Sequence, residues 1–219
     1  MFLGVPHNHL NFNILLTYLR DIALSSIHIN FFMDKSFKTF LKHTAKDFHN
    51  HSVNPPVVRA STIIFKSMSD IRRTQAKYKR DPRGGHFDYG RQGTSTTHIL
   101  SKILTRLEES YHVFLTPTGF GAVFLAIFSI IRPGDEILTA DPVYNPTRML
   151  TQDYLTEFGV KTTFYNPHDL SSIKKNITKK TKLIFVENPG SNTFEFQDLS
   201  KIISIAKKNK ILTAIDNTW

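Results

Sequence analysis

The stretch ILTAIDNTW at positions 211–219 is the part of the sequence that decides the fold. Five mostly apolar residues lead directly into Asp216, which is followed by asparagine, threonine and tryptophan. A short apolar run of this kind is typical of a strand that is buried on both faces of a parallel sheet. Ligands of such sheets bind beyond the carboxyl ends of the strands. The stretch therefore predicts a central strand that carries a carboxylate to a binding site.

Upstream of this stretch, apolar runs alternate with segments of helical periodicity. The expected strands are 112–116, 136–141, 161–166, 182–188 and 211–216, and the expected helices are 96–110, 119–131, 145–158, 169–177 and 198–209. Asp169 and Asp198 stand at N-cap positions of two of these helices. Strands alternating with helices predict an α/β fold with a mostly parallel sheet and helices on both faces.

The region before Tyr89 is less regular. Residues 33–88 show no periodic alternation, and the two prolines in SVNPPVVRAST (52–62) favour an extended chain. The segment at 80–94 is rich in glycine and charge, which predicts a loop. We expect 33–88 to be an N-terminal arm that packs on a partner subunit, 89–219 to be the folded domain and 1–32 to be an extension outside the fold.

The composition excludes several classes of protein. The 219 residues include no cysteine, which excludes disulfides, cysteine-ligated zinc sites and cysteine nucleophiles. Lys and Arg exceed Asp and Glu by 28 to 18, a formal charge of +10 that would suit a nucleic-acid partner. The lysines are scattered in short pairs, however, without the aromatic-interleaved stripe of single-strand binders. We therefore expect no nucleic-acid partner.

The N-terminal region raises two further possibilities. Arg20 and Asp21 interrupt the apolar patches of residues 1–32, which argues against a membrane helix, and no secretory signal is evident. We expect no membrane contact and a cytoplasmic location. His43, His49 and His51 could together hold a metal ion, but exposed histidines of a mobile arm are the expected state, so no metal site is predicted.

The segment TPTGFGAV (116–123) lies at a predicted turn from a strand to a helix. Glycines there let backbone N–H groups approach an anion, and the helix N-terminus adds positive potential, which suits a phosphate. A glycine turn without a ligand is one alternative. A nicotinamide-dinucleotide site, with Asp141 on the ribose, is another, but Phe124 stands where that fingerprint requires glycine.

Two further strand ends carry residues that suit a flat, cationic ring. The carboxylate of Asp216, at the end of a buried strand, needs a cationic or hydrogen-bonding partner, and a protonated ring nitrogen is one such partner. Tyr144 follows another strand end and could stack on the ring. Taken singly, these residues could be an ordinary loop cap and a core tyrosine. Together with the glycine turn they describe a site for pyridoxal 5'-phosphate (PLP).

Several longer segments resemble a known family. They are VNPPVVRAST (53–62), YGRQGTSTTHIL (89–100), RPGDEILTADPVYNPTR (132–148), FVENPGSNTFEFQDL (185–199) and AIDNTW (214–219). They are similar to the Cys/Met-metabolism PLP-dependent enzymes, and within that family most to the bacterial cystathionine β-lyases. The resemblance implies an aspartate-aminotransferase-like fold (PLP fold type I), with a large cofactor domain and a smaller C-terminal domain.

The resemblance also implies roles for individual residues. Gly119 and Phe120 would donate backbone N–H groups to the phosphate, Tyr144 would stack on the pyridine ring, and Asp216 would keep the ring nitrogen protonated. Tyr89 and Arg91 would reach across a subunit interface to the phosphate of a neighbour, because arginine matches phosphate geometry. This arrangement implies a homo-oligomer, a dimer or a tetramer.

The reaction implied by the resemblance is carbon–sulfur bond cleavage in a sulfur amino acid. The motif NPGS after Glu187 favours β-elimination, which converts cystathionine to homocysteine, pyruvate and ammonia. A γ-acting synthase or lyase remains an alternative, as does a non-catalytic gene remnant or half of a split enzyme.

The family's Schiff-base lysine is expected some 20 residues beyond Trp219, and the small domain with its carboxylate-binding arginine is expected further on. The chain therefore looks truncated, and we expect it to be catalytically inactive alone and poorly stable.

Overall fold

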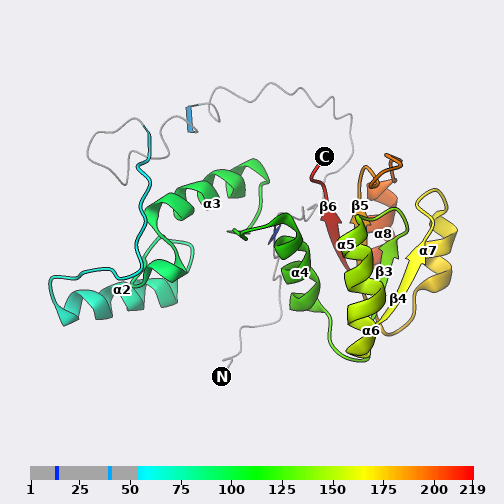
Figure 1. Ribbon diagram of the computed structural model, residues 1–219, viewed down its shortest axis with the longest axis horizontal. Coiled ribbons are helices and arrows are strands. Elements are labelled where there is room, and N and C mark those ends of the chain that lie inside the picture. The colour runs from blue at the N-terminus through cyan, green and yellow to red at the C-terminus, as the bar shows by residue number, and fades with distance from the viewer. Residues whose placement is uncertain (1–12, 15–38, 41–53) are drawn as a thin grey trace. The chain divides into compact units, whose positions relative to one another are not determined.

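The computed structural model describes residues 13–14, 39–40 and 54–219, which fall into two compact units (Figure 1). Of the described residues, one unit contains 13–14 and 114–219, and the other contains 39–40 and 54–113. Most of the predicted extension at 1–32 lies outside the described residues, as do the three histidines considered for a metal site. Among the described residues, no group of acidic and histidine side chains could hold a metal ion.

The unit of residues 114–219 is built on a four-stranded parallel sheet, which confirms the predicted fold class. Its strands are β3 (Glu136–Ala140), β4 (Lys161–Tyr165), β5 (Thr181–Glu187) and β6 (Leu212–Asp216). The strand order is β4-β3-β5-β6, and every neighbouring pair is parallel. All carboxyl ends therefore meet at one edge of the sheet.

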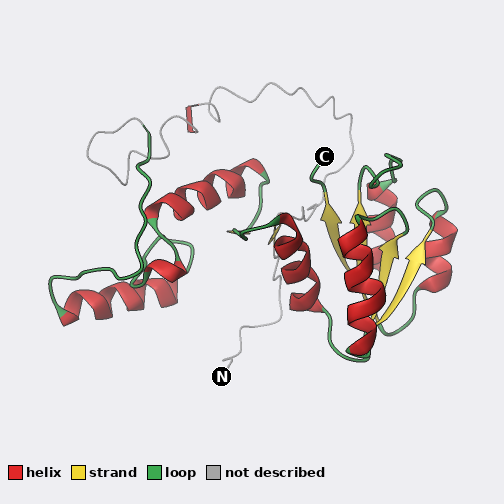
Figure 2. Cartoon of the chain, in the orientation of Figure 1, coloured by secondary structure: helices red, strands yellow, loops and turns green. Residues whose placement is uncertain are grey.

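Helices cover both faces of this sheet (Figures 1 and 2). They are α4 (Gly119–Ile130), α5 (Asn145–Met149), α6 (Leu155–Glu157), α7 (Leu170–Asn176) and α8 (Leu199–Lys208). Right-handed crossovers between parallel strands place α5 and α6 on one face and α7 and α8 on the other. Consistent with this arrangement, α4 contacts α5, and α7 contacts α8.

The core of this unit lies around β3 and β5. The side chains of Ile137, Leu183, Ile184 and Phe185 have no solvent exposure at all, as expected for strands sandwiched between two helical layers. Each fully buried aliphatic side chain contributes about 1.5–3 kcal/mol by its removal from water. The apolar run at 182–188 thus forms a buried strand, as predicted.

The helix termini follow the sequence signals closely. The Asp169 side chain accepts a bond from the Ser171 N–H at 2.8 Å, and that of Asp198 accepts one from the Lys201 N–H at 3.0 Å, which confirms both predicted N-caps. The helix predicted at 145–158 is less regular than expected. A π-helical segment, η2 (Leu150–Tyr154), separates α5 from α6.

The unit that includes residues 54–113 is mainly helical and polar. Its elements are α2 (Met68–Arg80), η1 (Gly90–Gln92) and α3 (Ser95–Leu107). The short strand β2 (Val113–Phe114) spans the boundary between the units and pairs with β1 (Asn13–Ile14). In the described part of the chain, no helix is long and apolar enough to cross a membrane.

Helix α2 was not expected, because the sequence of residues 33–88 has no periodic pattern. None of its residues is buried, so no apolar stripe marks it in the sequence. Local polar contacts define it instead. Ser67 accepts a bond from the Asp70 N–H at 3.2 Å, and Asp70 pairs with Arg73 at 2.9 Å.

Candidate functional site

A cavity of about 880 Å³ opens at the carboxyl edge of the sheet in residues 114–219. Its lining includes residues that follow β5 and β6, the start of α4 and the residue before α5. Four of the six residues predicted for the cofactor site, Gly119, Phe120, Tyr144 and Asp216, line this cavity together. The structure therefore brings together residues that are up to 97 positions apart.

The start of α4 offers backbone N–H groups that suit an anion. The first N–H groups of any helix lack an intrahelical acceptor. Here the Thr118 hydroxyl accepts the Gly121 N–H at 2.9 Å, which leaves the N–H groups of Gly119 and Phe120 for a ligand. A methyl group added at Gly119 would meet no atom within 4 Å, so the backbone at this point is open to an approaching group.

Asp216 ends β6 with its carboxylate held by the following turn. Its Oδ1 accepts bonds from the Thr218 hydroxyl at 2.6 Å and from the Thr218 N–H at 3.1 Å. Among the described residues, Oδ2 has no hydrogen-bond donor. Thr218 thus orients the carboxylate, and one of its oxygens remains for a cationic partner.

Tyr144 stands immediately before α5, where Pro146 near the helix start fixes the backbone for the first turn. Its side chain is about half exposed and lines the cavity. The backbone N–H of Tyr144 donates to Oε2 of Glu187 at 2.7 Å. The position of Tyr144 is therefore tied to the end of β5.

Glu187 is the site residue to which sequence reasoning assigned no role. It is in register with Asp216 on the neighbouring strand, and it is only 9% exposed. Burial and, to a smaller extent, the nearby Asp216 carboxylate raise the pKa of Glu187, whereas the bonds from the Tyr144 N–H and the Ser191 side chain lower it, and the net result is a pKa of about 7. The available signal was an acidic residue at the end of an otherwise apolar strand.

Asp141 does not belong to the cavity lining. Its carboxylate pairs with the guanidinium of Arg148, which lies 4.0 Å above the ring of Phe164. The acid that the dinucleotide alternative placed on a ribose is therefore engaged with an arginine of the same unit, and that alternative lacks its carboxylate.

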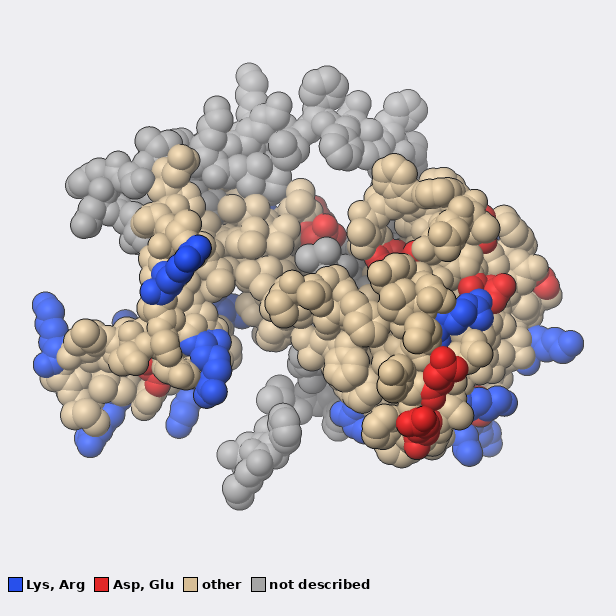
Figure 3. Space-filling view, in the orientation of Figure 1, with Lys and Arg blue, Asp and Glu red and all other residues tan. Residues whose placement is uncertain are grey.

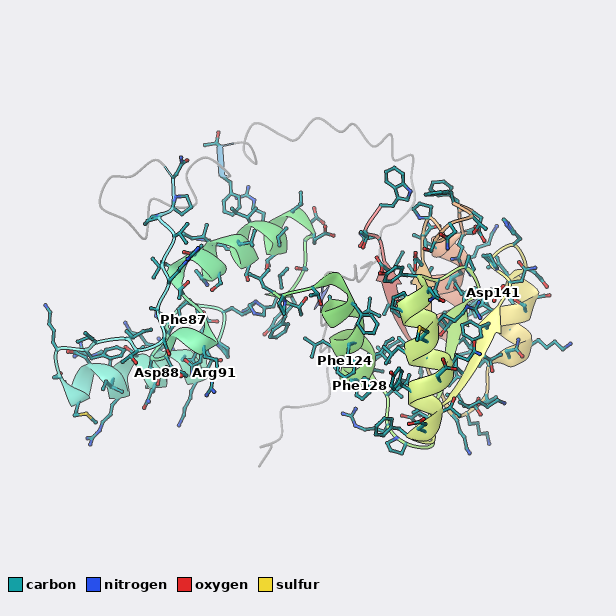
Figure 4. All side chains as sticks on the ribbon, viewed as in Figure 1. Phe87, Asp88, Arg91, Phe124, Phe128 and Asp141 are labelled. Atoms are coloured by element: carbon teal, nitrogen blue, oxygen red, sulfur yellow. The ribbon has the colours of Figure 1, made fainter. Side chains whose placement is uncertain are left out.

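Tyr89 and Arg91 lie in the other unit, and their predicted role at a neighbour's phosphate stays a prediction. The Arg91 guanidinium lies 5.0 Å from the centre of the Tyr89 ring. The Gly90 N–H donates to the Ser61 carbonyl at 2.7 Å, and a Cβ on Gly90 would lie 1.8 Å from the Ala60 carbonyl oxygen. Only glycine allows this approach. Figure 4 labels Arg91 together with Phe87 and Asp88 of the same unit.

The charged side chains on the face shown in Figure 3 are dispersed. On the face shown in Figure 3, Lys and Arg side chains are scattered over both units and alternate with Asp and Glu around residues 114–219. This face shows no continuous basic stripe of the kind that tracks a nucleic-acid backbone.

An open parallel sheet with the start of a helix, a carboxylate and an aromatic ring at one edge defines an α/β protein whose candidate site suits a flat, phosphorylated ligand. The family model of the Cys/Met metabolism PLP-dependent enzymes matches residues 38–219. The chain belongs to this family, as the resemblance of its longer sequence segments predicted.

Individual relatives agree with this assignment. A Saccharomyces cerevisiae protein assigned as a cystathionine beta-lyase is 41% identical over 167 residues, which is 76% of this chain and 46% of that protein. The cystathionine beta-lyase of Haemophilus influenzae is 34% identical over 177 residues, 80% of this chain and 43% of that enzyme. The chain spans about half the length of the curated relatives it matches.

A solved structure extends the comparison to the fold. A Campylobacter jejuni protein assigned as an O-acetylhomoserine (thiol)-lyase matches with a TM-score of 0.71 at 26% identity. The match covers 83% of this chain and 44% of that protein, whose crystal structure contains N'-pyridoxyl-lysine-5'-monophosphate. The family is PLP-dependent, which agrees with the cofactor predicted from the sequence.

Proposed function

We propose that this chain forms the cofactor-binding part of a PLP-dependent carbon–sulfur lyase that acts on cystathionine by β-elimination. The observation that supports the proposal most is the single cavity lined by Gly119, Phe120, Tyr144 and Asp216. These residues fit PLP because they offer an anion site, an aromatic face and a carboxylate. When bound, PLP supplies an electron sink that weakens bonds to the α-carbon of an amino acid.

Each residue of the chain has a defined task in this proposal. The N–H groups of Gly119 and Phe120 hold the phosphate, with the positive end of the α4 dipole behind them. The Tyr144 ring would stack on the pyridine ring. The Asp216 carboxylate, oriented by Thr218, would accept a charge-assisted hydrogen bond from the protonated ring nitrogen and so keep that nitrogen cationic.

The cavity lining contains no lysine among the described residues. The family resemblance assigns the covalent anchor to a lysine beyond Trp219, so a polypeptide of these 219 residues would hold PLP without forming a covalent bond to it. We infer that this polypeptide binds PLP but releases no pyruvate from cystathionine, and that catalysis requires the lysine. A homo-oligomeric state and a cytoplasmic location are part of the same proposal.

We prefer the β-reaction over the γ-alternative because of the motif NPGS at 188–191 and because relatives are named as cystathionine beta-lyases. The solved structure described above is named for a different sulfur substrate, so product analysis is the deciding measurement.

The test is a titration of the purified 219-residue chain with PLP. The emission of Trp219, the only tryptophan, is the readout, since this residue lines the cavity. We expect saturable quenching, and no pyruvate when cystathionine is added. Adding the same chain extended through the family lysine and small domain should restore pyruvate release. Absence of quenching, or pyruvate formed by the 219 residues alone, would contradict the proposal.

A further inference from the structure

Glu187 is a buried carboxylate that the proposed function does not use. It lies within the cavity lining, at the end of β5, and three different segments meet at its side chain. Asp216 is its register partner on β6, Tyr144 donates to it from the start of α5, and the Ser191 side chain approaches from the following loop.

The segment that contains Tyr144 forms a second hydrogen bond, to the loop that follows β5. The Ser191 N–H donates to the Pro142 carbonyl at 2.7 Å, so the chain after β3 and the chain after β5 are joined at two points. The two segments also pack tightly, because a Cβ on Gly190 would lie 3.0 Å from Cγ of Pro142. Of these two hydrogen bonds, the one to Glu187 is made by Tyr144 itself.

We propose that Glu187 is a positioning residue: its carboxylate fixes the backbone of Tyr144 to the β5–β6 edge and thereby sets where the Tyr144 ring lies in the cavity. This inference rests on the proposed PLP site. In this role Glu187 acts through the tyrosine and through the charge it places beside Asp216.

Because the Glu187 carboxylate lies beside Asp216, its protonation state depends on the ligand that is bound in the cavity. Two ionised carboxylates at the ends of adjacent strands repel each other, and a cation bound at Asp216 relieves that repulsion. A ring nitrogen that carries a proton is such a cation. Because Glu187 has a pKa of about 7, a cation at Asp216 favours its ionised form, and binding tightens as Glu187 loses its proton.

The first experiment tests the hydrogen bond between Tyr144 and Glu187 in the absence of any ligand. The full chain contains seven tyrosines, so selective 15N-tyrosine labelling gives few amide signals, and Y144F identifies the one from Tyr144. We expect the Tyr144 amide shift to move through an inflection near pH 7. The inflection should be absent in E187Q and present in E136Q, a matched change at the start of β3, where Glu136 accepts a bond from Thr178 at 2.7 Å.

The second experiment measures PLP affinity by Trp219 quenching from pH 5.5 to 8.5. The titration of PLP itself is common to all variants, so the ratio of dissociation constants, E187Q over wild type, isolates Glu187. We expect this ratio to rise from near one at low pH to about threefold to tenfold at high pH, the effect of up to one pKa unit of coupling. E187D, which keeps the charge but shortens the reach, should bind PLP more weakly at every pH.

Three results would overturn the inference: a Tyr144 amide that does not titrate in the wild type, one that titrates equally in E187Q, or an affinity ratio that is flat with pH. Failure of the proposed function looks different. In that case wild type and E136Q both show no quenching by PLP, while the amide titration still reports whether Glu187 holds Tyr144.

Discussion

The sheet unit of residues 114–219 and the helical unit that includes residues 54–113 differ in where their apolar side chains lie. In the sheet unit, whole strands such as β5 are buried. Among residues 54–113, only Ile99 and Val113 are buried apolar side chains, and Ile64 is 94% exposed. The sheet unit thus has a core that stabilises it and holds its site rigidly. The helical unit relies on capping, ion pairs and close backbone contacts.

The largest expected effect compares an isoleucine of each unit. Ile184→Ala removes a fully buried side chain from β5 and should lower the free energy of unfolding by about 3–4 kcal/mol. Ile64→Ala should change it by less than about 0.5 kcal/mol. Urea unfolding followed by Trp219 emission and far-UV circular dichroism measures both. Equal losses would mean that the helical unit has a core of similar importance.

A smaller effect is expected at the site, which belongs to the sheet unit. Asp216→Asn removes the charge that stabilises a protonated ring nitrogen, and PLP affinity should fall about tenfold to a hundredfold. Asp198→Asn is the matched control at the N-cap of α8, and it should leave affinity unchanged. Quenching of Trp219 by PLP is the measurement. An unchanged affinity in Asp216→Asn would remove this residue from the site.

The pH dependence of stability should also distinguish the units. The pKa of Glu187 is about 7 in the folded chain and near 4.5 when unfolded, so the folded chain binds this proton more tightly between those values. The free energy of unfolding should therefore fall as pH rises from about 5 to about 7, by on the order of 1–2 kcal/mol. Glu187→Gln should remove this slope. Unfolding of the sheet unit at several pH values tests the expectation, and a slope that survives in Glu187→Gln would contradict it.

The smallest effect concerns one helix cap in each unit. Thr118→Ala removes the cap of α4 and should cost about 1 kcal/mol of stability in the sheet unit. Ser67→Ala removes the cap of α2, a helix that buries none of its residues, and should only fray its first turn. Amide hydrogen exchange resolves the two helices. If Ser67→Ala also increased exchange in the strands, the two units would be energetically coupled.

The sequence predicted the two units unequally, for the same physical reason. A strand at 182–188 was expected from its apolar run and is present as Thr181–Glu187, because burial on both faces imposes that pattern. Helix α2 was missed because it has no buried face to impose one. The π-helical segment at Leu150–Tyr154 was also missed, since an extra residue in a turn leaves little trace in a short periodic pattern.

The residues of the candidate site were predicted only in part. Glycine and acidic residues at strand ends pointed to Gly119 and Asp216, because a parallel sheet brings those ends to one edge. The role of Glu187 could not be predicted, because it depends on a bond between its carboxylate and the backbone of Tyr144. Side-chain identity indicates which groups are present, whereas a backbone donor from a distant segment is visible only in three dimensions.

The bond between Tyr144 and Glu187 also has a consequence for the order of events in folding. It joins positions 43 residues apart. Tyr144 follows β3 and Glu187 ends β5, and these two strands pair in parallel although β4 and the helices α5, α6 and α7 lie between them in the sequence. Such distant pairings form slowly, because the loop must close before the contact contributes any stability. The local helices can form within microseconds, whereas the site cannot exist until the centre of the sheet has assembled. The Tyr144 amide signal would therefore report when this part of the site forms during folding.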